Sequence, residues 1–183
     1  MELKYCLVNN EVYTNIEYYI ARKKSVLDFL KPFLDFGQIK NVLDYGGDKG
    51  QYIPDQLSDA NKYVYDISGN QTIPNVMLLR TLNSVKQIKW DFILCMHLLE
   101  HLSDPLDTLK TLSGLLGGGN NTYLYIELPK QDYMHRYSDI EINEHINFFQ
   151  ENTMYKIGDL FKLRIINMKI ESTGIIRVLY QKM

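Results

Sequence analysis

Apolar residues recur at every third or fourth position along two stretches of the chain, which is the spacing of one face of an α-helix. These stretches are residues 15–34 and 105–116, and residues 148–161 also read as a helix. Pro32 is expected to kink or end the first helix, because proline removes a backbone donor and crowds the preceding turn. The second helix is the clearest, since an Asp-Pro pair precedes it and three glycines follow it.

Between these helices lie shorter runs rich in β-branched, aromatic and other apolar residues, which are typical of strands. The predicted strands are residues 41–47, 62–68, 76–82, 90–97, 122–129, 163–170 and 174–182. The run at 90–97 is almost continuously apolar, so we expect a central strand that is covered on both faces. The last two runs are close enough in sequence to pair as an antiparallel hairpin.

The connections between the strands complete the predicted topology. Residues 51–57 read as a poor helix interrupted by a proline, and the turn-forming segment 68–75 is shorter than an ordinary crossover helix. The sequence therefore predicts an α/β fold with a doubly wound, mostly parallel seven-stranded sheet, an antiparallel C-terminal hairpin and a reduced second crossover. A chain of 183 residues suits one domain, in which residues 1–40 form an N-terminal helical cap on a core of residues 41–183.

Composition and charge narrow the functional classes. Apolar residues make up 45% and charged residues 23% of the chain, and the formal net charge is -2. No extended basic surface is expected, so nucleic acid is not an expected partner. The sequence shows no membrane-spanning run and no signal-peptide pattern, so we expect a cytoplasmic protein. Cys6 and Cys95 lack metal-ligand spacing, and neither a disulfide nor a metal is expected.

A glycine-rich turn, DYGGDKG at residues 44–50, follows the first strand. Ligands of open α/β sheets bind outside the carboxyl ends of the strands, where glycine permits close backbone approach. The turn lacks the dinucleotide fingerprint G-x-G-x-x-G, and the chain has no P-loop. It resembles the first motif of class I S-adenosylmethionine-dependent methyltransferases, D-x-G-x-G-x-G. Asp44, Gly46 and Gly50 match this motif, whereas Asp48 replaces its central glycine and adds bulk and negative charge, which Gly47 partly relieves.

Two later segments strengthen this resemblance. MHLLEHLSDPLDTL, which follows the fourth predicted strand, is similar to the H-x-L-E-H-L-x-D-P run of one branch of these methyltransferases, and EHINFF at 144–149 is similar to the E-H-x-x-F-F stretch of the same branch. The resemblance covers residues 41–183 and implies a Rossmann-like fold that binds S-adenosylmethionine. That branch methylates sugars, quinone precursors and other small metabolites, so the resemblance implies a small-molecule acceptor, with a sugar or surface-glycan precursor as the leading expectation.

The resemblance also implies roles for individual residues. Asp66 ends the second strand, where an acidic side chain can accept both ribose hydroxyls, and Asn83 is expected to meet the adenine edge. The residues expected to bind the cofactor are Asp44, Gly46, Gly47, Gly50, Asp66 and Asn83.

Two histidines are the candidates for removing a proton from a hydroxyl acceptor. His97 lies at the carboxyl end of the predicted central strand, and His145 follows the loop expected to roof the cleft. The alternative for each is a buried histidine held by hydrogen bonds. Glu100 and His101 are expected to fix the loop and cap the next helix. The segment 130–143 could line an acceptor pocket or be a solvated loop.

Two other functions are weighed against a methyltransferase of small molecules. In the first, Asp48 and the shortened second crossover have removed cofactor binding, and the protein is a non-catalytic partner or regulatory subunit. The second is nucleic-acid methylation, which requires a basic face and an N/D-P-P-Y/F segment, and the sequence shows neither. A homodimer is left open.

Overall fold

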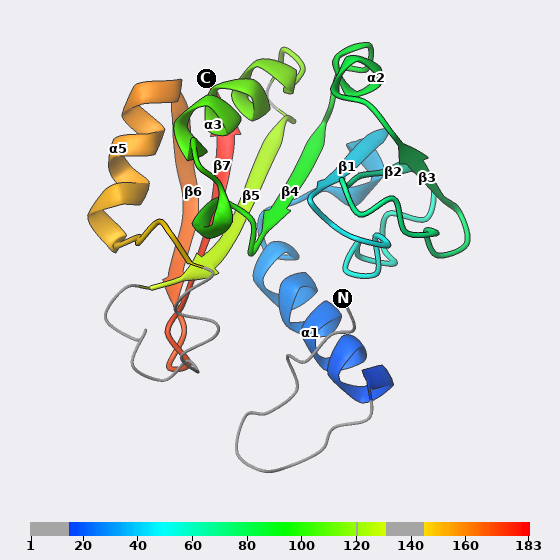
Figure 1. Ribbon diagram of the computed structural model, residues 1–183, viewed down its shortest axis with the longest axis horizontal. Coiled ribbons are helices and arrows are strands. Elements are labelled where there is room, and N and C mark those ends of the chain that lie inside the picture. The colour runs from blue at the N-terminus through cyan, green and yellow to red at the C-terminus, as the bar shows by residue number, and fades with distance from the viewer. Residues whose placement is uncertain (1–14, 120, 131–144) are drawn as a thin grey trace.

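Figure 1 shows the computed structural model of the chain, which describes residues 15–119, 121–130 and 145–183. Seven strands form one sheet in the order β3-β2-β1-β4-β5-β7-β6. The strands are β1 (Asn41–Tyr45), β2 (Asn61–Tyr65), β3 (Val76–Leu79), β4 (Phe92–Met96), β5 (Tyr123–Pro129), β6 (Leu163–Ile170) and β7 (Ile175–Lys182). This sheet confirms the predicted fold class.

The strand β4 lies at the centre of the sheet, as predicted, and each of its five residues is buried. β1, β2, β3, β4 and β5 run parallel, with Leu43 of β1 opposite Ile93 of β4. β7 pairs antiparallel with both β5 and β6, which confirms the C-terminal hairpin. The carboxyl ends of β1, β2, β4 and β5 therefore meet along one edge of the sheet.

Helices cover the two faces of the sheet unequally. One face packs against α2 (Leu82–Lys86), α3 (Pro105–Leu115) and α5 (Glu151–Phe161), which contribute the buried residues Val85, Leu109, Leu112, Leu115, Met154 and Ile157. The other face packs against α1 (Asn15–Leu30), the short η1 (Phe36–Gln38) and the segment 46–60. Successive residues of a strand point to opposite faces of the sheet, so Leu43 of β1 packs in the apolar core on the first face and Val42 in the core on the other.

The helix predicted for residues 51–57 is not present. Residues 46–60 instead follow a series of four-residue turns, in which the amide of Ile53 donates to Gly50 O at 3.3 Å and the amide of Leu57 donates to Pro54 O at 3.2 Å. Pro54 explains the difference, since its ring cannot donate to an α-helical ladder and clashes with the preceding turn. Tyr52, Ile53 and Leu57 still fill the core, so turns replace the helix without exposing the sheet.

Other boundaries agree more closely with the sequence. The connection 66–75 contains no helix, which confirms the reduced second crossover, and α1 ends at Leu30 ahead of Pro32. The third predicted strand ends at Leu79, because the Thr81 side chain accepts the amide of Ser84 at 3.1 Å and starts the short α2. Among the described residues, none of the helices has the length and apolar character that crossing a bilayer requires.

Candidate functional site

The glycine turn after β1 is held in a backbone conformation that side chains tolerate poorly. Gly46 and Gly50 have φ angles of 77° and 75°. A Cβ atom on Gly46 would lie 2.8 Å from Leu98 Cδ2, and one on Gly50 would lie 2.9 Å from Val76 Cγ1. Both predicted glycines are therefore required by conformation and by space.

Asp44 is the last fully buried residue of β1, at the start of this turn. Neither of its carboxylate oxygens makes a hydrogen bond with the described residues. Burial raises the pKa of Asp44 to about 7, and the Arg22 charge opposes this effect only in part. Gly47 makes room for the carboxyl group, because a Cβ at position 47 would lie 2.0 Å from Asp44 Cγ. The turn thus presents a buried acid that has no hydrogen-bond partner in the described part of the chain.

Asp48 occupies the position of the motif's central glycine with a left-handed φ of 53°. Its Oδ1 accepts a 2.7 Å hydrogen bond from Asn70 Nδ2, and its amide donates to Asp66 Oδ2 at 2.9 Å. The other oxygen of Asp66 accepts the amide of Ser68 at 2.7 Å. Asp66 therefore ties the glycine turn to the β2–β3 loop, and each oxygen keeps one lone pair for a further donor.

Two further side chains stand beyond the carboxyl ends of β2 and β3. Ile67 follows Asp66 and has 95% of its side chain exposed, which makes it the most exposed large apolar residue described. Ile67 was not among the predicted site residues, although its position directly after an acidic strand end is visible in the sequence. Asn83 lies in the first turn of α2 and is exposed, as an adenine contact would need to be.

A buried network of charges occupies the carboxyl edge between β4 and β5. Glu127 of β5 is 2% exposed, and its Oε1 lies 2.8 Å from Arg22 Nη2 and 3.2 Å from His97 Nε2. Its Oε2 accepts from Tyr125 Oη at 2.7 Å and lies 2.9 Å from Arg177 Nε. Burial alone would raise the pKa of Glu127, but the hydrogen bond from His97 and the two arginine charges hold it well below its ordinary value. The sequence hints at this network only through Glu127, a charged residue inside an otherwise apolar strand, because a buried charge requires partners.

His97 follows β4 with a left-handed φ of 49°, and its amide donates to Glu127 O at 2.8 Å. Its ring is held between two carboxylates, with Nδ1 3.3 Å from Glu100 Oε1 and Nε2 3.2 Å from Glu127 Oε1. Burial and Arg22 lower the pKa of His97, but its close contacts with the Glu100 and Glu127 carboxylates outweigh them, so the pKa lies above its usual value. Both ring nitrogens are therefore engaged within the protein.

His145 lies beside the turn η2 (Leu99–His101) and is buried. Its imidazole packs edge-on against that of His101, with ring centroids 4.7 Å apart. The following residues are fixed to η2 by the amides of Ile146 and Asn147, which both donate to Glu100 O. The structure therefore brings the second predicted histidine to the same edge as His97. The segment 130–143, with the exception of Lys130, lies outside the described residues.

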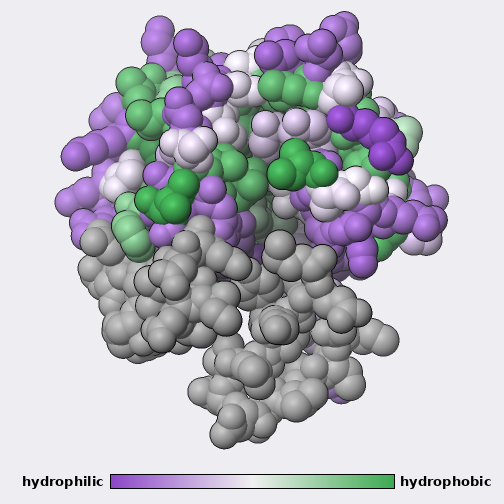
Figure 2. Space-filling model, in the orientation of Figure 1, coloured by the Kyte–Doolittle hydropathy of each residue, from purple (hydrophilic) through white to green (hydrophobic). Residues whose placement is uncertain are grey.

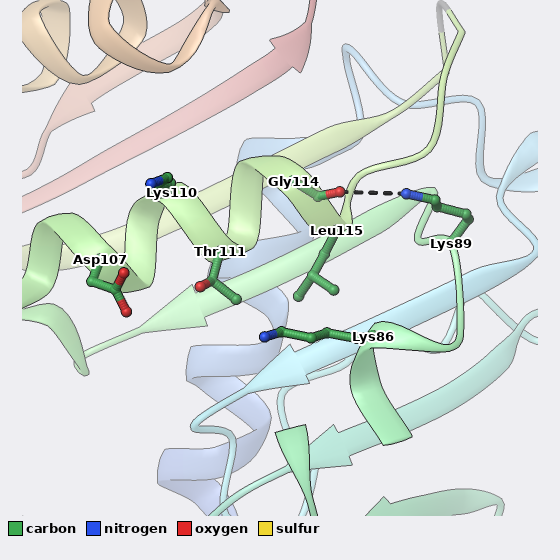
Figure 3. Close-up of a pocket in the computed structure, with 7 residues that line it drawn as sticks. All are labelled: Lys86, Lys89, Asp107, Lys110, Thr111, Gly114 and Leu115. Carbon is green, nitrogen blue, oxygen red and sulfur yellow. Dashed lines mark hydrogen bonds between the residues drawn. The ribbon is translucent and has the colours of Figure 1, made fainter. Parts of the chain in front are cut away.

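An open depression of the described surface lies elsewhere. It measures about 340 Å³ and is lined by residues of α2, of α3 and of the segment before β4, including Lys86, Lys89 and Lys110 (Figure 3). It contains none of the predicted site residues. Apolar and hydrophilic side chains alternate on the molecular face seen in Figure 2.

Comparison with known proteins agrees with this arrangement. A family model described as a methyltransferase domain matches residues 16–166. The chain belongs to this methyltransferase domain family. No curated protein matches the chain.

Solved structures that are similar to this methyltransferase-family chain share its fold. A SAM-dependent methyltransferase from Thermotoga maritima has a TM-score of 0.66 at 14% identity, over 92% of this chain and 94% of that one. The magnesium protoporphyrin IX methyltransferase from Synechocystis PCC 6803, solved with bound SAH, has a TM-score of 0.65 at 15% identity, over 95% of this chain and 90% of that one. An O-methyltransferase family protein from Burkholderia thailandensis has a TM-score of 0.61 at 11% identity over 92% of this chain, which spans only 60% of that protein. Together with the family assignment, these structures support S-adenosylmethionine as the cofactor.

Proposed function

We propose that this chain binds S-adenosylmethionine at the glycine turn and transfers its methyl group to a small metabolite. The observation that carries the proposal is Asp44, a fully buried carboxyl group without a hydrogen bond among the described residues. Leaving such a group without a partner costs free energy, which a bound cation would recover. The α-ammonium group of S-adenosylmethionine is a cation of suitable size, and Asp44 would hold it.

The neighbouring residues fit the rest of the cofactor. Gly46, Gly47 and Gly50 leave the turn without side chains, so that its backbone can approach a ligand. Asp66 has a remaining lone pair on each oxygen for ribose hydroxyls. Ile67 offers an exposed apolar surface next to Asp66, which would cover one face of a purine. We keep Asn83 as the proposed contact to the adenine edge.

The acceptor would be bound at the carboxyl ends of β4 and β5. When bound, S-adenosylmethionine supplies a methyl group on a sulfonium for in-line displacement, so the protein must align the acceptor and exclude water. We assign His97 to positioning, because carboxylates engage both of its ring nitrogens. His145 is the better candidate for accepting a proton from a hydroxyl acceptor. A small-molecule acceptor is supported by the similarity of the fold to the magnesium protoporphyrin IX methyltransferase, and a sugar or glycan precursor stays a prediction.

Calorimetric titration with S-adenosylmethionine and S-adenosylhomocysteine tests the proposal. We expect saturable binding with a Kd on the order of micromolar for the wild-type protein, and binding at least about tenfold weaker for Asp44→Asn. Asp159→Asn changes an exposed acid on α5 and is the matched control, which should bind as the wild type does. Folded wild-type protein that binds neither ligand would refute the proposal.

The non-catalytic alternative is favoured by a specific observation. Both oxygens of Asp66 already accept backbone amides, those of Asp48 and of Ser68, within the described structure. Under this alternative the chain is a partner or regulatory subunit that keeps the fold without binding the cofactor. The same titration separates the two functions, because only the methyltransferase requires S-adenosylmethionine to bind.

A further inference from the structure

Glu100, His101 and His145 form a second cluster of chemically active side chains, beside the cofactor site described above. Each offers one ligand atom, and the three atoms lie within 4.8 Å of one another. Glu100 and His145 are buried and His101 is partly exposed, so the cluster reaches the surface on one side. The two contributing segments are more than forty residues apart in the sequence, which is why no ligand spacing was visible there.

Backbone hydrogen bonds fix the geometry of this cluster. The amides of Ile146 and Asn147 donate to Glu100 O at 2.9 and 3.0 Å. The side-chain amide of Asn147 donates to Leu99 O at 3.1 Å and to Leu102 O at 2.5 Å. His145 is therefore held against η2 by the protein itself, as a preorganised binding site requires.

The charge balance of the cluster points to a bound cation. Glu100 is 0% exposed, and neither carboxylate oxygen makes a well-formed hydrogen bond with the described residues. Among the described residues, the basic atoms in contact with Glu100 Oε1 are His97 Nδ1 at 3.3 Å and His101 Nε2 at 3.9 Å. The imidazoles of His101 and His145 pack edge-on with ring centroids 4.7 Å apart, and one ligand atom of each lies within 4.8 Å of a Glu100 carboxylate oxygen. One divalent ion held between the three side chains would satisfy this buried carboxylate.

We propose that Glu100, His101 and His145 bind one divalent transition-metal ion, with Zn²⁺ as the preferred ion. Two imidazoles and one carboxylate form the protein ligand set of catalytic zinc sites, which keep a fourth position open. Imidazole ligands favour Zn²⁺ over Mg²⁺, whose ligands are oxygens. Ligand atoms around one Zn²⁺ lie roughly 3.5 Å apart, so small side-chain rotations would close the site.

His97 would not bind the metal itself but would hold the metal-binding carboxylate of Glu100 in place. Its Nδ1 faces Glu100 Oε1 at 3.3 Å, and its other nitrogen is anchored on Glu127, so it orients the ligating carboxylate. A metal-bound His145 could not also accept a proton from the acceptor. At its open position the metal would instead hold and polarise a hydroxyl acceptor as a Lewis acid, a role that rests on the proposed function.

Metal binding is tested on untagged protein after dialysis against a chelator, by titration with Zn²⁺ against a chromophoric competitor and by the visible absorption of the Co²⁺ form. We expect one equivalent of Zn²⁺ per chain and a Co²⁺ spectrum typical of four-coordinate N/O ligation. His101→Ala and Glu100→Gln should each weaken binding at least about tenfold. His101 is partly exposed, so His101→Ala is expected to fold, which circular dichroism checks.

Asp159→Asn is the control for adventitious binding to surface carboxylates and should take up Zn²⁺ as the wild type does. The proposal is overturned if the wild type takes up no Zn²⁺ or Co²⁺, or if folded His101→Ala binds the ion as tightly as the wild type. The metal-free protein is also titrated with S-adenosylhomocysteine. Binding of this ligand without uptake of Zn²⁺ would refute the metal site alone, whereas absence of binding would refute the proposed function.

Discussion

Arg22 of α1 and Glu127 of β5 are separated by 105 positions in the sequence, yet their side chains form a 2.8 Å ion pair at the carboxyl edge of the sheet. The guanidinium of Arg22 also lies 4.5 Å from the centre of the Tyr52 ring. The N-terminal helix is therefore joined both to the strand beside His97 and to the irregular segment after the glycine turn.

Removal of the Glu127 charge should destabilise the fold. Glu127→Gln leaves Arg22, Arg177 and His97 without their shared carboxylate, and the expected loss in the free energy of unfolding is about 3 kcal/mol. Urea denaturation measures this loss. Asp28→Asn breaks the exposed Lys24–Asp28 pair and should cost less than about 0.5 kcal/mol. Equal effects of the two substitutions would contradict the importance of the buried network.

Asp44 should make stability depend on pH in the ligand-free protein. Its pKa is about 7 in the folded protein against 3.8 ordinarily, so the folded state binds the proton more tightly than the unfolded state does. The contribution of this group to stability is full below about pH 4 and is lost as the pH rises through about 7, with a slope of at most about 1.4 kcal/mol per pH unit.

Asp44→Asn removes this contribution. The stability of the variant relative to the wild type should therefore increase between pH 5 and pH 8, as measured by urea denaturation at each pH. A difference that is constant across this range would show that Asp44 titrates as an ordinary exposed acid.

Two glycine substitutions should have opposite effects. Gly47→Ala places a methyl group on the Asp44 carboxyl group and should destabilise the protein by about 1–3 kcal/mol, with weaker binding of S-adenosylhomocysteine. Gly114 is exposed within α3 and has no atom within 4 Å of an added Cβ. Gly114→Ala should therefore stabilise the helix by about 0.5–1 kcal/mol. Thermal unfolding and calorimetry measure both, and similar effects at the two sites would disprove the steric argument.

Asp48 should reduce cofactor affinity through its charge. Asp48→Asn keeps a residue type that tolerates the left-handed φ of 53° and removes the negative charge, so binding of S-adenosylhomocysteine should tighten about threefold or more. Asp48→Gly also removes the bond to Asn70, and comparison of the two variants separates charge from conformation. Unchanged affinity in both variants would mean that the carboxylate points away from the ligand.

The sequence predicted the sheet well because buried strands and their turns leave strong local signals. The apolar run at 90–97 could only be a central strand, and the Asp-Pro pair marked the start of α3 at Pro105. The missing helix at 51–57 was harder, since its apolar residues are buried in either conformation and only Pro54 argued against a helix.

The charged edge of the site could not be predicted, because it depends on contacts across the sheet. Arg22 belongs to a basic run that looks like a solvated helix face, and nothing local indicates that it reaches Glu127. The meeting of Glu100 with His145 likewise requires the folded path of the chain. The glycine turn, in contrast, is a continuous motif that the sequence shows directly, and in the structure Gly46 and Gly50 have positive φ angles.

The replacement of crossover helices by turns has a consequence for local unfolding. The β1–β2–β3 half of the sheet is joined by segments 46–60 and 66–75, whose backbone makes isolated turn bonds instead of a continuous helical ladder. The other half is braced by α3, α5 and the long β6–β7 hairpin. Amide hydrogen exchange should therefore be faster in the first half, and it should slow there when a ligand fills the glycine turn. Under the proposed function, cofactor binding would therefore stabilise the half of the sheet that has the fewest helical connections.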